Sequence, residues 1–315
     1  MKLSALAAPL RPIALWSPIG LDSSQSLIDV SLEAEGSERD VTDRQVVLSL
    51  APLMIAVAHA PGRTHSSGRG ASQARLHFRD RARGIELGSL QLSAAGRIDA
   101  GDTALDCYSV DGSRHRCLPA PLRAWQRWLQ TQRPRDERGG FSMNAADVQH
   151  LLVFYICPRP VVLVSVDDGE CQNLFPMDLV GTIGGEHFTL ALRNTSPSVA
   201  TLRNAGRAVL ADVPLADRAL AYSLGAHHRL KKIDWSTLPC ATIHSSRFGF
   251  RVPAQAPRVR ELTIIAAQEQ GSHTTFLCRV TSDEIRASVP RLFHTSGIHR
   301  AWRRGHGTAP WREPS

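Results

Sequence analysis

Residues 157–214 read CPRPVVLVSVDDGECQNLFPMDLVGTIGGEHFTLALRNTSPSVATLRNAGRAVLADVP. This stretch begins with an apolar, β-branched run, Val161–Val166, which is typical of a buried strand. The following Asp167–Gly169 has the composition of a tight turn. Two further runs, Cys171–Phe175 and His187–Leu192, are also expected to be extended. The first part of the stretch therefore predicts three strands.

The second part of the stretch changes to a helical pattern. Ser196 is a suitable N-cap, and Pro197 is favoured at the first helical position. Gly206 is placed to end this helix, because glycine adopts the left-handed conformation that helix ends require. Arg207–Val213 then returns to strand character. The predicted order is strand, hairpin, strand, helix, strand.

Length and composition place this stretch in a globular protein of 315 residues, which suggests about two domains. The net charge of +8 favours an anionic partner, but the excess is carried by arginine, with three lysines in the chain. No basic motif interleaved with aromatic residues is present, so nucleic acid is not an expected partner. No apolar run is long enough to span a membrane, and we expect a cytoplasmic protein.

The six cysteines form no CxxC pair, so we expect free thiols in a reducing compartment. Cys107 and Cys117 flank a predicted hairpin turn at Asp111-Gly112, where they either face each other or stay unpaired. The adjacent His227-His228 is not expected to bind a metal, because neighbouring imidazoles rarely reach one ion.

The organisation predicted for the whole chain has five parts. They are an N-terminal extension (1–26), a β-rich unit (27–132), a charged linker (133–140), a second domain (141–297) and a basic tail without regular structure (298–315). In the first unit, Val46–Ala58 is expected to form two strands separated at Pro52. Leu122–Thr131 is expected to be a helix, and the tryptophans on one of its faces are expected to pack in a core or a domain contact.

The order of elements in 157–214 resembles that of the flavin reductase-like family of FMN-binding split barrels. The residues that carry the resemblance are RPVVLVS at 159–165, NLFP at 173–176, and SPS at 196–198 followed by TLRN at 201–204. The resemblance extends more weakly to about Glu284 and covers under half of the chain. It implies a mainly β fold with short helices, a split barrel, and a homodimer with the flavin at the subunit interface.

The resemblance also implies where a flavin would bind. Its ring would lie against the end of a strand formed by Asn173, Leu174, Phe175, Pro176 and Met177. Thr201 is retained from the family's helix element, and Lys232 lies where the family has a lysine-containing loop near the flavin. Gly271-Ser272-His273 matches a Gly-x-His element, which implies that His273 lies near the nicotinamide or the flavin edge.

A phosphate site is expected just before this helix on physical grounds. Phosphate binds backbone N–H groups at a helix N-terminus together with hydroxyls and a guanidinium. Such groups are supplied by Arg193, Asn194, Thr195, Ser196 and Ser198. The alternative is an ordinary Ser-Pro helix cap beside a solvated arginine.

Several catalytic patterns are missing from the sequence. It contains no GxGxxG, no Walker motif, and no convincing Ser-His-Asp, Cys-His or paired-carboxylate arrangement. Gly181–Gly185 is followed by no helix and is expected to be a loop. These observations argue against a Rossmann dehydrogenase.

Two functions remain open. The first is an NAD(P)H:flavin oxidoreductase that passes hydride from nicotinamide to FMN, or to FAD, and supplies reduced flavin to a partner monooxygenase. In such an enzyme the flavin carries the redox chemistry, and the protein binds and positions it. The second is a diverged, non-catalytic flavin-binding module whose N-terminal unit binds a partner protein. Leu174-Phe175 and Val199-Ala200 depart from the family pattern and favour the second function.

Overall fold

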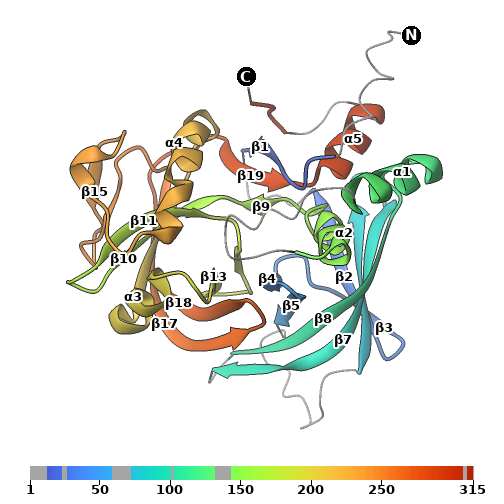
Figure 1. Ribbon diagram of the computed structural model, residues 1–315, viewed down its shortest axis with the longest axis horizontal. Coiled ribbons are helices and arrows are strands. Elements are labelled where there is room, and N and C mark those ends of the chain that lie inside the picture. Colours follow the sequence, from blue (N-terminus) through green and yellow to red (C-terminus); the bar gives the residue numbers. More distant parts are fainter. Residues whose placement is uncertain are drawn as a thin grey trace.

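The computed structural model describes residues 13–22, 27–58, 72–100, 103–131, 143–307 and 311–314. Two seven-stranded antiparallel sheets dominate this part of the chain, one from each half of the sequence (Figure 1). The predicted mainly β fold is therefore confirmed. Among the described residues, no helix combines the length and the apolar character needed to cross a membrane.

The first sheet has the strand order β3-β2-β6-β7-β8-β5-β4. Its strands are β2 (Ile28–Ala34), β3 (Ser37–Asp40), β4 (Gln45–Leu50), β5 (Leu53–Ala58), β6 (Gln73–Asp80), β7 (Glu86–Ala100) and β8 (Thr103–His115). The prediction of two strands separated at Pro52 is confirmed by β4 and β5. One face of the sheet packs against α2 (Ala145–Phe154), whose Leu151 and Phe154 are fully buried in a shared core.

The second sheet has the strand order β11-β10-β14-β17-β18-β13-β12. Its strands are β10 (Val162–Asp167), β11 (Gln172–Met177), β12 (Val180–Thr182), β13 (His187–Arg193), β14 (Arg207–Asp212), β17 (Arg258–Gln270) and β18 (His273–Ile285). The predicted helix is α3 (Ser198–Ala205), whose Leu202 is buried against this sheet. Gly206 ends α3 with a φ of 62°, as expected. The order of elements predicted for 157–214 is therefore confirmed, except that Gly181 and Thr182, expected to lie in a loop, belong to the short strand β12.

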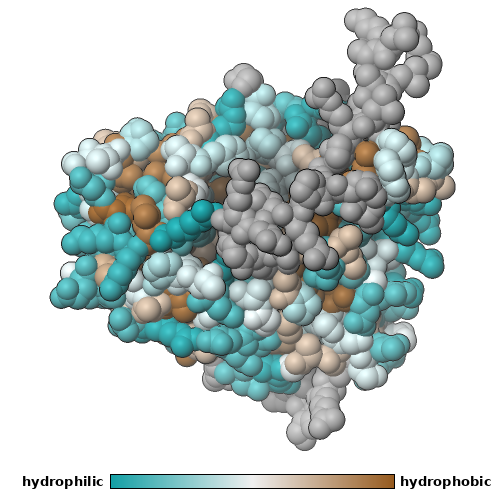
Figure 2. Space-filling model, viewed as in Figure 1, coloured by the Kyte–Doolittle hydropathy of each residue, from teal (hydrophilic) through white to brown (hydrophobic). Residues whose placement is uncertain are grey.

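Shorter elements complete the described chain. A three-stranded sheet joins β1 (Ser17–Leu21), β19 (Arg291–Thr295) and β9 (Arg159–Pro160), so that segments near both termini meet beside the two large sheets (Figure 1). The second half also contains η4 (Leu215–Asp217), α4 (Arg218–Ser223), η5 (Leu224–Arg229), η6 (Trp235–Thr237), β15 (Thr242–His244) and β16 (Arg251–Pro253). Figure 2 shows hydrophobic residues gathered on the side of the view where Figure 1 places α4 and β15.

The two large sheets share a core. Val46 and Leu48 of β4 belong to the same buried cluster as Ile183 and Leu277 of the second sheet. A Cβ at Gly181 would lie 2.7 Å from Val46 Cγ1, so this glycine permits the close approach of β12 to β4. The two sheets are therefore packed directly on each other at β4.

The hairpin predicted at Asp111-Gly112 is wrong. Residues 103–115 form one continuous strand, β8, in which Gly112 pairs with Gln91 of β7. The long ladder between β7 and β8 outweighs the local turn preference of Asp-Gly, because each cross-strand pair adds to the extended conformation. Cys107 and Cys117 do not form a pair across a hairpin, and both are free thiols, as are the other cysteines.

The tryptophans of α1 (Ala120–Thr131) are not in a core. Trp125 and Trp128 stack on each other with ring centroids 4.8 Å apart, and they are 38% and 50% exposed. The helix instead buries Gln126 and Gln130. The prediction of core packing for these two tryptophans is therefore wrong, because the helix turns its amide face inward, and the alternative of a domain contact stays a prediction.

The C-terminal tail, expected to lack regular structure, contains α5 (Gly297–Gly305). Ile298 and Trp302 of this helix are buried, and Arg303 forms an ion pair with Asp80 of β6. The sequence analysis missed this buried face because the segment is rich in arginine. The charged linker 133–140 lies outside the described residues, so the domain boundary there stays a prediction. Although α2 lies within the predicted second domain, it packs on the first sheet.

Candidate functional site

The predicted phosphate site lies where β13 ends beside the start of β18. In the register of these strands, Arg193 is opposite His273. The backbone N–H of Asn194 donates to the Ser272 carbonyl at 3.1 Å, and its side-chain amide donates to the Gly271 carbonyl at 3.0 Å. The structure therefore brings together two parts of the predicted site that are far apart in the sequence.

Four cationic or titratable side chains gather here, and we call Arg193, His228, Arg229 and His273 the cationic cluster. Partial burial, and then the charge of Arg229, lower the pKa of Arg193. Burial, with a contribution from Arg193, lowers the pKa of His273 to about 4 and also lowers that of His228. Both imidazoles are therefore neutral near pH 7, and the two guanidiniums supply the positive charge.

The hydroxyls expected to bind phosphate divide into two groups. Thr195 is exposed, as are Arg193 and Asn194. Ser196 is buried, and its hydroxyl donates to the His228 carbonyl at 3.2 Å. Ser196 is thus not the N-cap of α3, which begins after Pro197 without a side-chain cap. Its hydroxyl is instead engaged by η5.

The two hydroxyls on α3 itself are covered. Ser198 is 1% exposed, and its Oγ accepts a long hydrogen bond of 3.4 Å from the Asn173 amide. Thr201 is 3% exposed. Both residues face the sheet, so the accessible part of the predicted phosphate site is Arg193, Asn194 and Thr195.

The strand expected to bind the flavin ring is the edge strand β11. The Asn173 side chain donates to the carbonyls of His227 and Leu230 at 2.9 and 2.8 Å, and its Oδ1 accepts from the Leu174 N–H at 2.8 Å. Leu174 and Phe175 are fully buried in two different cores. Their bulk therefore fills the protein interior and does not enter a slot at the strand edge.

The outer edge of β11 is hydrogen-bonded to η5. His227 Nδ1 lies 2.8 Å from the Leu174 carbonyl oxygen, and His228 Nε2 lies 2.6 Å from that of Pro176. Met177 is buried at the end of the strand, and Lys232 is exposed in the segment after η5. The edge expected to contact the flavin ring is thus engaged by residues of the same chain.

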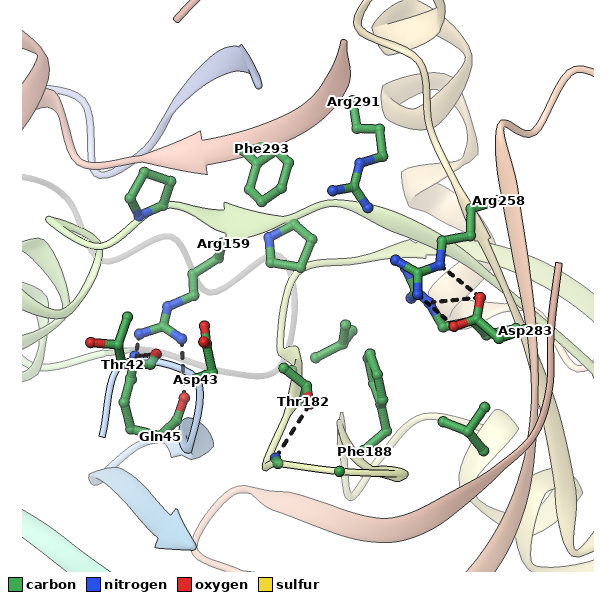
Figure 3. Close-up of a pocket in the computed structure, with 18 of the residues that line it drawn as sticks. Thr42, Asp43, Gln45, Arg159, Thr182, Phe188, Arg258, Asp283, Arg291 and Phe293 are labelled. Carbon is green, nitrogen blue, oxygen red and sulfur yellow. Dashed lines mark hydrogen bonds and ion pairs between the residues drawn. The ribbon is translucent and has the colours of Figure 1, made fainter. Parts of the chain in front are cut away.

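A cavity that the sequence did not predict lies at the junction of the two sheets. Its volume is about 780 Å³, and it is bounded by β4, β9, β12, β13, β18 and β19 (Figure 3). Arg159, which sequence analysis treated only as part of a family motif, lines this cavity and is 7% exposed. One of its terminal nitrogens donates to the Gln45 carbonyl at 3.1 Å, and the other bonds the Gln45 side chain.

The far wall of the cavity carries three arginines with acidic partners. Arg260 and Arg291 each lie 2.7 Å from an oxygen of Asp212, and Arg258 binds Asp283 through two nitrogens. Asp212 is 4% exposed. Three guanidiniums thus meet two carboxylates, and the wall keeps one net positive charge.

A second polar network was also missed. His294 Nδ1 lies 2.7 Å from Asp178 Oδ2, and its Nε2 lies 3.0 Å from the Tyr222 hydroxyl. Burial opposes ionisation of Asp178, but hydrogen bonds from His294 and Tyr155 lower its pKa overall. The partners are far apart in the sequence, so no local pattern could reveal them. Among the described residues, no group of three His, Cys, Asp or Glu is arranged to hold a metal ion.

Comparisons with known proteins complete the description. No family model and no curated protein matches the sequence. Among solved structures, an NADH:FAD oxidoreductase from Streptomyces globisporus is 17% identical, with a TM-score of 0.42 over 53% of this chain and 94% of that chain. An FMN-binding protein from Thermus thermophilus is 19% identical, with a TM-score of 0.37 over 41% of this chain and 72% of that chain.

The flavin reductase of a styrene monooxygenase from Pseudomonas putida is 14% identical, with a TM-score of 0.38 over 46% of this chain and 95% of that chain. The chain is thus similar, at low identity and over about half of its length, to flavin reductases and FMN-binding proteins.

Proposed function

We propose that this protein binds FMN, with its phosphate at the cationic cluster, and acts as an NAD(P)H:flavin oxidoreductase. The observation that carries the proposal is the pairing of β13 with β18, which brings Arg193 opposite His273 beside the start of α3, with Arg229 near enough for its charge to lower the pKa of Arg193. Two like charges held together at the start of a helix favour an anion between them. A phosphate dianion would relieve their repulsion and bind both.

The residues around the cluster define what the chain would contribute. Arg193 and Arg229 would hold the phosphate, and the exposed Thr195 hydroxyl would add a hydrogen bond. The bound flavin would supply the ability to accept hydride. His273 is 1% exposed, and its Nδ1 lies 2.8 Å from the Ser272 hydroxyl. Because His273 pairs with Arg193 across β18 and β13, its neutral ring would hold the strand that carries Arg193 in place. In this proposal His273 is a positioning residue.

A second candidate is a non-catalytic flavin-binding module. It is favoured by the bonds from His227 and His228 to β11, because those bonds occupy the strand edge that a flavin ring would otherwise use. The exposed pair Trp125 and Trp128 on the first half is consistent with a partner protein, since tryptophan is enriched at interfaces. The first proposal also includes a homodimer and the delivery of reduced flavin to a monooxygenase. It takes FMN as the flavin, with FAD as the alternative.

Anaerobic titration distinguishes the two functions. The protein is mixed with FMN, and then NADH or NADPH is added while the visible absorbance of the flavin is followed. Bleaching at a rate above that of free FMN supports the oxidoreductase, and binding without bleaching supports the module. Absence of FMN binding contradicts both.

Two variants place the site. Arg193→Gln is expected to weaken FMN binding at least tenfold, or about 1.4 kcal/mol. Arg203→Gln is the matched control, because Arg203 is an exposed arginine on α3 that pairs with Glu269. Equal affinities of the two variants would contradict the phosphate site.

A further inference from the structure

The cavity at the junction of the sheets has the form of a small-molecule site. Its volume of about 780 Å³ lies within the range of ligand pockets. Gln45 comes from the first sheet and Thr42 from the turn before it, Thr182 and Phe188 come from the second sheet, and Arg159 comes from β9 (Figure 3). None of these residues belongs to the cationic cluster, so the cavity is separate from the proposed phosphate site.

Arg159 is a buried charge with neutral contacts. Its terminal nitrogens bond Gln45, and its Cζ lies 4.0 Å from the centre of the Phe154 ring. Within the described part of the chain, no carboxylate lies within ion-pair distance of it. Asp178 acts on it electrostatically, but that carboxylate is hydrogen-bonded to His294. A buried cation without a paired anion is costly, so an anionic ligand would stabilise it.

One donor of this guanidinium is not used within the described protein. The buried Nε of Arg159 has no hydrogen-bond partner in the described structure. The Nε–H and one terminal N–H lie on the same edge of a guanidinium, and that edge binds a carboxylate through two parallel bonds. The geometry of the unused donor therefore favours a carboxylate.

The remaining lining fixes the charge and shape of the ligand. Arg260 and Arg291 share the single carboxylate of Asp212, and the acidic residues Asp43 and Glu186 are exposed and solvated. The lining thus keeps an excess of positive charge, to which the buried Arg159 contributes, and this excess favours an anion. The aromatic and apolar side chains that complete the lining favour a flat apolar body, and they are Leu21, Leu27, Val180, Phe188, Val280 and Phe293.

We propose that this cavity binds a small aromatic carboxylate, whose carboxylate pairs with Arg159 and whose ring lies among the apolar side chains between the sheets. The site does not depend on flavin binding. A carboxylate ligand also explains why a charged residue is buried on β9. A neutral side chain would fill the same space without the cost of removing a cation from water.

Benzoate is the probe, and benzamide, which has the same shape without the charge, is its control. Binding is measured by calorimetry and by ligand-observed NMR on the full chain. We expect benzoate to bind at least tenfold more tightly than benzamide. Arg159→Met is expected to lower benzoate affinity at least tenfold, whereas Arg159→Lys keeps part of it and Arg97→Gln, at an exposed arginine, leaves it unchanged.

Arg159→Met also removes the link between β9 and β4 and is expected to lower stability, so Thr182→Trp provides an independent test by filling the cavity. We expect it to abolish benzoate binding while FMN binding, followed by flavin fluorescence, is retained. The proposal is overturned if wild-type protein does not bind benzoate, if benzamide binds equally well, or if Thr182→Trp leaves benzoate binding intact. Loss of benzoate binding in Arg193→Gln but not in Thr182→Trp would place the anion at the cationic cluster and also contradict it.

Discussion

The Asn173 side chain holds η5 against the edge of β11, and its replacement tests this arrangement. The side chain is 1% exposed and donates two hydrogen bonds, at 2.9 and 2.8 Å, to the carbonyls of His227 and Leu230. In Asn173→Asp the shape is retained, but the donor becomes an oxygen that faces two carbonyl oxygens. The substitution therefore removes both bonds and adds repulsion without creating a cavity.

The magnitude follows from those contacts. Each lost hydrogen bond costs about 1 kcal/mol, and a buried carboxylate oxygen facing two carbonyl oxygens adds about 1 kcal/mol or more. We expect the free energy of unfolding to fall by about 3 kcal/mol near neutral pH, which urea denaturation would measure. The loss should shrink as the pH is lowered, because a protonated carboxyl can again donate one hydrogen bond. Gln268→Glu, at an exposed amide side chain on β17, is the control and should change stability by less than about 0.5 kcal/mol. A loss below about 1 kcal/mol for Asn173→Asp would refute the reasoning.

Two further predictions concern stability. Burial lowers the pKa of His115 and His273 to about 4 and that of His299 to about 3, so the unfolded chain binds more protons than the folded chain below the ordinary histidine pKa of 6.5. Stability should therefore fall as the pH drops from about 6.5 toward 4, and a flat profile of unfolding free energy over that range would contradict the burial of these rings. Trp302→Ala should destabilise the protein by about 3–5 kcal/mol, because this side chain is buried under α5, whereas the exposed Trp128→Ala should cost less than about 1 kcal/mol. Equal losses in thermal or urea unfolding would show that α5 is not packed.

Local patterns in the sequence predicted the elements whose conformation is decided locally. The apolar run before Asp167 became β10, Pro52 separated two strands, and Gly206 ended α3. In each case a propensity and the tertiary structure favour the same conformation. Asp111-Gly112 shows the opposite case, because pairing with β7 imposed an extended conformation on a sequence that favours a turn.

The prediction for the basic C-terminal segment was wrong for a different reason. Its arginines suggested a solvated tail, but Ile298 and Trp302 lie on one side of α5 and pack against the first half of the chain. Nothing in the local sequence identifies that surface. Long-range packing, like long-range strand pairing, has to be seen in the structure.

The candidate site was predictable only in part. Arg193 and His273 were each singled out from the sequence, but their pairing across β13 and β18 depends on the register of the sheet. Arg229, which supplies the second charge, lies in the basic run at 227–232, but no local pattern places it beside Arg193. The bonds from His227 and His228 to β11 depend on how η5 folds back over the edge strand, and the cavity around Arg159 requires both sheets.

Comparing FMN with riboflavin tests the central claim most directly, since the two ligands differ only in the phosphate. Flavin fluorescence titration of the full chain should show that FMN binds at least tenfold more tightly than riboflavin. This preference should disappear when Arg193 and Arg229 are both replaced by Gln. Equal binding of FMN and riboflavin to the wild-type protein, or an FMN preference that survives both substitutions, would contradict a phosphate site at the cationic cluster.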